Sequence, residues 1–319
     1  MRGAVPSLAP PIRKQMKIPL GEAIRIKPII TALCLAQLFG VRAMAENAFF
    51  AMDTGTKDAQ HQTAEAQAEL VKEIGFAGIG PIYSTPQGLQ ELLAALDKRQ
   101  LKLFAEYLPL NFESPDPISP QIKDSINQLK GRDSMLWLCV PKPPVKGLKP
   151  SDPAGDALAV PVLQQIADLA AQSGVRVALY PHASNWVERI DDAVRLAQKV
   201  HRKNLGVTFN LCHWLLVDGK DLDAHLDAAR PWLFVVTING ADSGVQGWAH
   251  LKQLIQPLDT GTFDVGLLLK KLKQIGYDGP IGLQHYGIGG DAEKNLRRSM
   301  DGWRRLQAKL QNDNTNPAK

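Results

Sequence analysis

Polar and titratable side chains stand at the ends of several apolar runs in this sequence. The run GVTFNLCHWLLV, residues 206–217, carries Asn210, Cys212 and His213 among branched and aromatic residues. An Asx-x-x-His spacing supplies an oxygen and an imidazole nitrogen, which suits half of a metal site or a proton transfer. Other apolar runs end on Glu106, Tyr107, Tyr180, His182, Asn239, Asp242, Gln284, His285 and Tyr286.

Histidine is the main candidate for catalysis. Three of the seven histidines, His182, His213 and His285, occupy these run ends. Because imidazole has an ordinary pKa of about 6.5, His182 and His213 are candidates for general acid and general base. Glu106 is the carboxylate within a run, and it is either a further catalytic base or a structural partner of a cation.

The remaining polar residues at these positions are suited to bind sugar hydroxyls. The substrate-binding candidates among them are Tyr180, Asn210, Asn239, Asp242 and Gln284. Aromatic rings near the expected loops can stack on the apolar face of a sugar, and the candidates are Trp214, Tyr286, Trp186, Trp248 and Tyr83. For each tryptophan, packing between a helix and the sheet is the alternative interpretation.

Eight short apolar runs alternate with amphipathic segments. The runs are residues 48–53, 77–82, 101–108, 134–141, 175–182, 205–212, 232–239 and 279–286. Near-continuous apolar runs are typical of strands covered on both faces, and Gly75 and Thr85-Pro86 mark ends of the helices between them. The pattern predicts an α/β fold, a (β/α)8 TIM barrel formed as a single domain by residues 46–310. A doubly wound open sheet is the alternative, but no glycine-rich dinucleotide fingerprint follows the first run.

The two ends of the chain lie outside this repeat. Residues 1–45 are expected to be a signal peptide, because basic residues precede an uncharged run of fourteen, residues 28–41, and Ala43 and Ala45 have signal-peptidase spacing. Met16 offers an alternative start, and an uncleaved anchor is the alternative interpretation. Cleavage predicts a periplasmic or secreted protein with no membrane span. Residues 311–319 are expected to be a disordered tail.

Charge and cysteine content exclude two classes of protein. The net charge of +5 derives from residues 1–45, which hold seven Lys or Arg and one Glu; the remainder has 30 basic and 31 acidic residues. A mature chain of this balance has no basic face for nucleic acid. Only Cys139 and Cys212 remain beyond the leader, so a disulfide scaffold is excluded and both are expected to be buried thiols.

Residues 48–306 resemble the xylose-isomerase-like TIM barrels of the sugar phosphate isomerase and epimerase superfamily. The resemblance rests on GVTFNLCHW, where the family commonly has a strand ending Asp-x-x-His, and on QPLDTGTFDVGLLLKKLKQIGYDGPIGLQ, which is similar to the family's last strand–helix unit. It implies a divalent metal that positions a sugar for proton or hydride shifts. The positions matching the family's usual metal ligands carry Tyr180, Asn210, Asn239 and Gln284, all uncharged.

These substitutions argue against the family's metal. Mg²⁺ and Mn²⁺ need carboxylate charge, which amides and a phenol do not supply, so no cofactor is expected. A Zn²⁺ site built from His182, His213, His285 and Glu106 is the alternative. Neighbouring side chains on a strand face opposite ways, however, so His285 should point away if Gln284 points inward.

The sequence therefore predicts an exported isomerase, epimerase or lyase acting on an unphosphorylated sugar by proton transfer at histidine. The glycine-rich turn in YGIGGDAEKN, residues 286–295, is interpreted as turn geometry, since Asp291 at the helix start would repel a phosphate. A barrel without catalysis that binds a glycan or a protein partner is the alternative. DNA repair is excluded by the leader, by the charge and by the missing zinc ligands.

Overall fold

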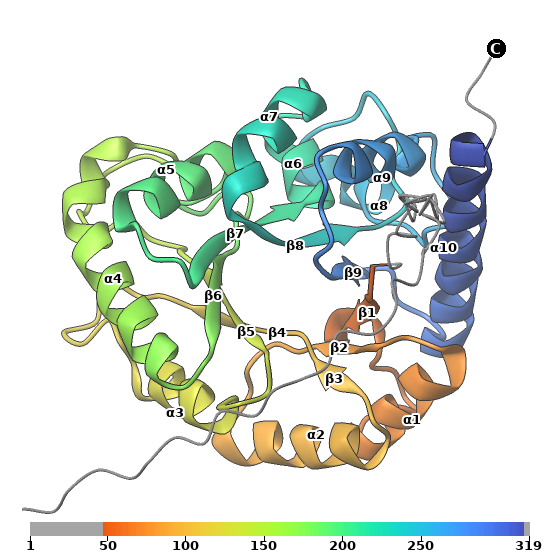
Figure 1. Ribbon diagram of the computed structural model, residues 1–319, viewed down its shortest axis with the longest axis horizontal. Coiled ribbons are helices and arrows are strands. Elements are labelled where there is room, and N and C mark those ends of the chain that lie inside the picture. Colours follow the sequence, from red (N-terminus) through yellow and green to blue (C-terminus); the bar gives the residue numbers. More distant parts are fainter. Residues whose placement is uncertain (1–46, 316–319) are drawn as a thin grey trace, which may run out of the picture. The chain divides into compact units, whose positions relative to one another are not determined.

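Nine parallel strand segments form one closed sheet with helices around its outside (Figure 1). The computed structural model describes residues 47–315, and side chains up to residue 312. The strand order is β3-β2-β1-β9-β8-β7-β6-β5-β4, and an isolated bridge between Ile82 and Tyr107 connects the two edges. The predicted (β/α)8 barrel is confirmed as a single domain.

The nine segments correspond to eight strands. They are β1 Phe49–Met52, β2 Gly78–Gly80, β3 Lys102–Leu103, β4 Ala105–Pro109, β5 Met135–Cys139, β6 Arg176–Leu179, β7 Leu205–Asn210, β8 Leu233–Ile238 and β9 Ile281–Leu283. β3 and β4 are two parts of the run predicted as one strand, interrupted at Phe104. β3 pairs with β2 and β4 pairs with β5, so the interrupted strand joins the two sides of the barrel.

Ten α-helices lie in the part of the chain that the structure describes, and the ends of α1 and α2 carry the predicted capping residues. The helices are α1 Ala64–Ile74, α2 Pro86–Lys98, α3 Pro120–Gln128, α4 Asp156–Gln172, α5 Ile190–Val200, α6 Leu211–Val217, α7 Leu222–Ala229, α8 Leu251–Leu254, α9 Val265–Gln274 and α10 Ala292–Thr315. The Thr63 and Thr85 hydroxyls accept backbone N–H groups at the starts of α1 and α2. Gly75 ends α1 at a φ of 97°, a left-handed conformation that suits glycine.

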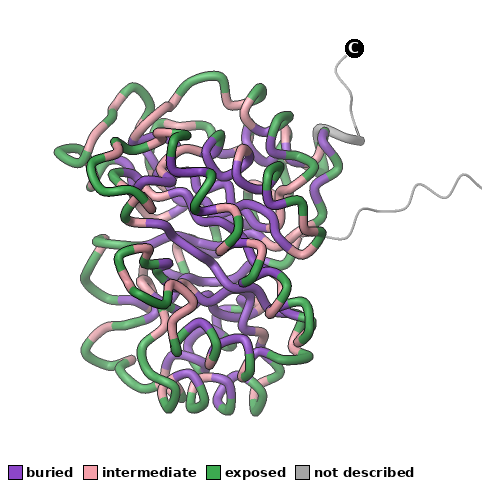
Figure 2. Tube along the Cα trace, turned by 90° about the vertical axis from the view of Figure 1, so that its left-hand side faces the viewer, coloured by how far each residue is buried: buried purple, intermediate pink, exposed green. Residues whose placement is uncertain are grey.

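The apolar core has two layers, one between strands and helices and one inside the barrel. Figure 2 shows the buried strands in the middle of the molecule and exposed residues on its outer helices and loops. Inside the barrel, Phe50 stacks on Phe104 with ring centroids 4.7 Å apart and lies 5.8 Å from Trp137. Cys139 and Cys212 are buried and free, as predicted.

Two predicted boundaries are corrected. The run 205–212 is a strand only to Asn210, because the Asn210 side chain caps α6 by accepting the His213 N–H at 3.4 Å. At the other end, α10 continues through Thr315, so residues 311–315 are helical where a disordered tail was predicted. The predicted leader, residues 1–45, and the alternative start at Met16 lie outside the described residues. Within residues 47–315, no helix combines the length and the apolar character needed to cross a membrane.

We expect Gly282→Ala to destabilise the barrel through Phe50. A Cβ at residue 282 would lie 2.6 Å from Phe50 Cζ, so the ring would have to move inside a filled core. Overpacking of this kind costs about 1–3 kcal/mol of the free energy of unfolding, measured by denaturant titration. In a Phe50→Leu background, which lacks the ring, the same glycine substitution should cost less. Equal costs in both backgrounds would show that the ring is not the obstacle.

Candidate active site

An inner cavity of about 180 Å³ opens at the carboxyl ends of the strands, where barrel active sites lie. Its volume is below the roughly 300–1,000 Å³ of pockets for drug-sized ligands, so it fits a small molecule. Its lining residues are Met52, Thr54, Ile82, Tyr107, Tyr180, His182, His213, Trp248, Leu251, Ile255, Gln284 and Tyr286. Among the described residues, no carboxylate, lysine or arginine lines it.

A chain of uncharged hydrogen bonds crosses the floor of this cavity. The Thr54 hydroxyl donates to Gln284 Oε1 at 3.0 Å, and Gln284 Nε2 donates to the Tyr180 hydroxyl at 3.4 Å. Asn210 Nδ2, at the end of β7, also donates to the Tyr180 hydroxyl. Burial raises the pKa of Tyr180 well above its ordinary value of 10, so the phenol stays protonated. Its own O–H therefore remains available to an oxygen atom of a ligand.

His182 and His213 are neighbours at one wall, with ring centroids 4.0 Å apart and ring planes tilted by 40°. One residue, Ala183, fixes both rings through its backbone. The Ala183 N–H donates to His213 Nδ1 at 3.3 Å, while His182 Nδ1 lies 2.9 Å from the Ala183 carbonyl oxygen. A carbonyl accepts and an N–H donates, so His182 carries its proton on Nδ1 and neutral His213 carries its proton on Nε2. The Nε2 atoms left to a ligand are thus an acceptor on His182 and a donor on His213.

Burial keeps both rings neutral. Desolvation lowers the pKa of His182 below its ordinary value of 6.5, although the Ala183 carbonyl offsets part of this. Desolvation, and then the neighbouring His182, lower the pKa of His213 well below 6.5. Near neutral pH the pair therefore offers one proton acceptor and one proton donor without net charge.

Trp248 covers the two histidines. It belongs to the loop after β8, and its ring centroid lies 6.0 Å from that of His182 and 6.4 Å from that of His213. Its Nε1 donates to the Ser184 hydroxyl at 2.8 Å, which ties this loop to the one that carries His182. Trp248 and Tyr286 are the predicted stacking residues that line the cavity.

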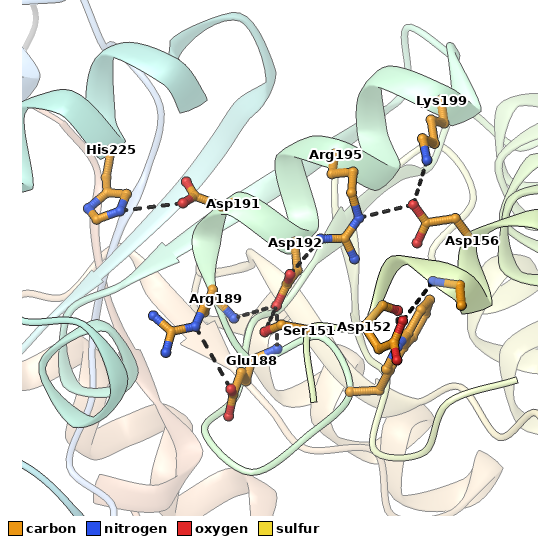
Figure 3. A network of polar contacts seen from close by, with 12 residues as sticks. Ser151, Asp152, Asp156, Glu188, Arg189, Asp191, Asp192, Arg195, Lys199 and His225 are labelled. Carbon is orange, nitrogen blue, oxygen red and sulfur yellow. Dashed lines mark hydrogen bonds and ion pairs between the residues drawn. The ribbon is translucent and has the colours of Figure 1, made fainter. Parts of the chain in front are cut away.

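A network of polar contacts holds the loop that carries Ala183, the residue whose backbone contacts both histidines (Figure 3). Asp192, near the start of α5, accepts the Ser151 hydroxyl at 2.7 Å and the Arg189 N–H at 3.0 Å through one oxygen. Its other oxygen accepts Arg195 NH1 at 2.6 Å, and Arg195 Nε reaches Asp156 at 3.0 Å. The loop between β6 and α5, residues 180–189, is thereby held against α4 and the loop after β5.

Four predicted substrate-binding residues do not line the cavity. One of them, Asn210, contacts the lining residue Tyr180. Trp214 follows His213 on α6 and packs in the strand–helix layer, its Nε1 donating to His225 at 3.2 Å. Asn239 Nδ2 donates to the carbonyls of Gly240 and Leu254, both at 2.7 Å, and so closes the loop after β8. Asp242 accepts the Thr262 N–H at 3.1 Å in a loop. The binding roles predicted for Trp214, Asn239 and Asp242 are wrong for this cavity. Asn239 and Asp242 bond backbone groups instead, and Trp214 bonds the His225 side chain.

Two further residues face the helices rather than the barrel interior. Tyr107 lines the cavity, so Glu106, its neighbour on β4, points the other way and is fully buried near Ser125 of α3. Gln284 points inward, and His285 bonds the Ser299 hydroxyl of α10 at 2.8 Å, as strand alternation predicted. The catalytic role predicted for Glu106 is therefore wrong.

The donor set does not fit the family's metal. The described residues contain no group of three or more His, Cys, Asp or Glu side chains able to hold a metal ion. Of the four positions that match the usual ligands, Asn239 faces away, and Tyr180, Asn210 and Gln284 bond one another. The alternative zinc site fails because His285 and Glu106 do not meet His182 and His213. The chemistry of this site is therefore considered without a metal.

Several lining residues were not among the predicted site residues. They are Met52, Thr54, Ile82, Tyr107, Leu251 and Ile255. Thr54 directly follows the first apolar run. The other candidates were chosen because they stand at the ends of such runs, so the same criterion would have identified Thr54. Leu251 is the first residue of α8 and Ile255 follows its last, and this helix is too short to show a helical pattern in the sequence.

Comparisons with known proteins agree with this fold. A family model described as a xylose isomerase-like TIM barrel matches residues 68–306. A ketose 3-epimerase of Arthrobacter globiformis is 26% identical over 166 residues, which cover 51% of this chain and 53% of that protein. The match thus spans about half the length of that relative.

Solved structures share the barrel at low identity. A D-allulose 3-epimerase of Methylomonas sp. in complex with D-allulose has a TM-score of 0.66 and 16% identity, covering 82% of this chain and 97% of that chain. The IOLI protein with a zinc atom has a TM-score of 0.65 and 19% identity, covering 82% of this chain and 98% of that one. At these identities the likeness shows the fold alone.

We expect Glu106 to make the protein less stable as pH rises. Burial raises the pKa of its carboxyl from 4.5 to about 7. The nearby Ser125 hydroxyl lowers this pKa, and the negative charge of Asp124 raises it further. Between these values the folded state keeps a proton that the unfolded state releases, so the free energy of unfolding falls through that window. Glu106→Gln should remove the fall, which amounts to ~3 kcal/mol at most.

Denaturant titrations of wild type and variant at about pH 5 and about pH 8 measure this difference. The free energy of unfolding of Glu106→Gln, relative to that of wild type, should be higher at the higher pH than at the lower one. Glu113→Gln, at an exposed loop position, is the matched control and should show no such change. An equal response of both variants to pH would refute the assignment.

Proposed function

The chain belongs to the xylose isomerase-like TIM barrel family, and on this premise we propose that it is an exported sugar isomerase, epimerase or lyase that uses a histidine pair. The observation that carries the proposal is the opposite protonation of His182 and His213, fixed by Ala183. A proton shift beside a carbonyl needs one group that accepts a proton and another that donates to the carbonyl oxygen. The pair offers both, 4.0 Å apart, in one small cavity.

In the proposed reaction His182 is the base. Its Nε2 takes a proton from the carbon beside the sugar carbonyl, and the electron pair of the broken C–H bond forms the C=C bond of an enolate. The negative oxygen accepts hydrogen bonds from His213 Nε2–H and from the Tyr180 hydroxyl. A neutral imidazole is an effective donor for this purpose. The imidazolium of His182 then returns its proton to the former carbonyl carbon, while the hydroxyl proton on the deprotonated carbon moves to the enolate oxygen, so that the C=O bond forms at the other carbon and the sugar is isomerised. Return of the proton to the same carbon and face regenerates the substrate.

An unphosphorylated substrate fits the charges around the site. The start of α10, where a barrel often holds phosphate, is capped by two carboxylates: Asp58 accepts the Ala292 N–H and Asp291 accepts the Lys294 N–H, both at 2.9 Å. These groups occupy the N–H donors and repel an anion. No lysine or arginine among the described residues lines the inner cavity to offset this.

The proposal includes catalysis without a divalent metal. The relative with a zinc atom shares the fold, but the neutral Tyr180, Asn210 and Gln284 supply no carboxylate for a cation. Their hydrogen bonds to one another serve instead to orient the Tyr180 hydroxyl toward the ligand.

A glycan-binding or protein-binding barrel without catalysis is the second candidate. It is favoured by one observation: all four positions that match the family's usual ligands are uncharged, and three of them are joined by hydrogen bonds. A binder would retain the sugar-sized cavity yet show no proton exchange with any sugar.

We expect solvent deuterium to enter the sugar in a panel of keto- and aldo-sugars, D-allulose included, incubated with the protein in D₂O. His182→Gln should lower the exchange rate by about 10²–10⁴, because the base is lost. His213→Ala should lower it by about 10²–10³, because a donor to the enolate oxygen is lost. NMR of the recovered sugars measures the exchange. His201→Asn, at an exposed position outside the cavity, is the control and should exchange normally.

The exchange rate should also depend on pH in one direction. The unprotonated form of His182 is the active one, and burial lowers its pKa below 6.5. The rate should be constant between about pH 7 and about pH 8 and fall as pH drops through that lowered pKa. Absence of exchange with every sugar would favour the binding protein, and full exchange in His213→Ala would contradict the donor role of His213.

We expect the exported protein to lack residues 1–45, with Glu46 at its N-terminus. Ala43 and Ala45 provide the signal-peptidase spacing, and the charge balance of the remainder suits an unanchored protein. Intact-mass spectrometry of protein purified from the secreted or periplasmic fraction measures the N-terminus. A chain that still begins at Met1 or Met16 would contradict export by cleavage.

A further inference from the structure

A second cavity adjoins the inner one. This outer cavity has a volume of about 310 Å³ and is lined by Trp248, Ala249, His250, Leu251, Lys252, Gln253, Ile255, Tyr286 and Gly287. Four of these residues, Trp248, Leu251, Ile255 and Tyr286, also line the inner cavity. The two spaces thus meet at a shared wall, and a ligand too long for the inner cavity would continue into the outer one.

The shared wall exposes aromatic surface to solvent. Trp248 is 45% exposed and Tyr286 is 55% exposed, and Ile82 beside them is 45% exposed. Among the described residues, the other exposed large apolar side chains are Val145, Leu158 and Leu267, and none of these lines either cavity. Exposed aromatic rings grouped at the opening of the two cavities indicate a binding surface, because a ligand that covers them removes their apolar area from water.

The outer cavity also offers polar groups that the inner one lacks. His250, Lys252 and Gln253 line it, and His250 Nδ1 lies 2.8 Å from Gln253 Oε1, which fixes the orientation of both side chains. Aromatic faces on one side with hydrogen-bonding groups on the other match a pyranose, which has an apolar C–H face and an edge of hydroxyls. The site therefore suits a sugar ring.

We propose that the outer cavity binds the second ring of a disaccharide or glycoside whose reacting ring occupies the inner cavity. This inference rests on the proposed function, whose substrate class it narrows. The inner cavity of about 180 Å³ holds one small ring, so the glycosidic bond passes between Trp248 and Tyr286. The second ring stacks on these aromatics and bonds to Gln253 and His250.

Binding without turnover tests the proposal. We expect isothermal titration calorimetry of the mature protein to show that at least one of cellobiose, maltose, sophorose and lactose binds about tenfold or more tightly than D-glucose. Tyr286→Ala and Gln253→Ala should each abolish this preference. Leu267→Ala is the control: it removes a side chain that is 61% exposed on α9 and should keep the preference.

Two results would overturn the outer site. One is equal binding of D-glucose and all four disaccharides, or binding of none of them. The other is a disaccharide preference that survives in both Tyr286→Ala and Gln253→Ala. The proposed function fails separately: a disaccharide preference without deuterium exchange would keep the outer site and remove the acid–base role of His182 and His213.

Discussion

Each side chain on a barrel strand must face either the barrel interior or the helices, and the rest of this structure depends on that alternation. Phe50 and Trp137 face inward and fill the barrel, and the inner cavity lies at the carboxyl ends of the strands. Tyr107 and Gln284 face inward and line that space, while Glu106 and His285, one residue away on the same runs, are buried against the helices. The alternation therefore decides which groups a ligand can meet.

The Ala183 backbone decides which ring nitrogen of His182 and of His213 carries the proton. Its N–H and its carbonyl oxygen impose opposite protonation on two identical side chains, a distinction that neither ring would have in water. This depends on a loop held in place from outside the site. Asp192 is buried and bonds both Ser151 and Arg189, so the backbone that carries Ala183 is fixed by α5 and the loop after β5. The chemistry of the cavity and the packing of the outer layer are thus parts of one arrangement.

The barrel could be predicted from the sequence because burial on both faces makes strands near-continuously apolar, and helix ends carry local signals such as Thr85-Pro86. The cavity could be predicted only in part. His182, His213, Tyr180 and Gln284 follow from their place at run ends, but Asn239 and Asp242 occupy similar places and bond the nearby backbone instead. Alternation read from a single run also fails where the strand is interrupted at Phe104 or turns into a helix at Leu211. Such outcomes depend on contacts with residues distant in sequence.

The neutrality of the site follows from the loss of its carboxylates. A buried imidazolium needs an opposite charge nearby, and the inner cavity provides none among the described residues, so burial drives both histidines to the neutral form. Burial likewise raises the pKa of the Tyr180 phenol and keeps it protonated. Because no lysine or arginine among the described residues lines the cavity, no cation there attracts an anion. A neutral acceptor, two neutral donors and aromatic walls then favour a neutral ligand rich in hydroxyls. Charge appears in the reaction only when a proton moves from carbon to His182, and the resulting imidazolium and enolate balance each other within the cavity.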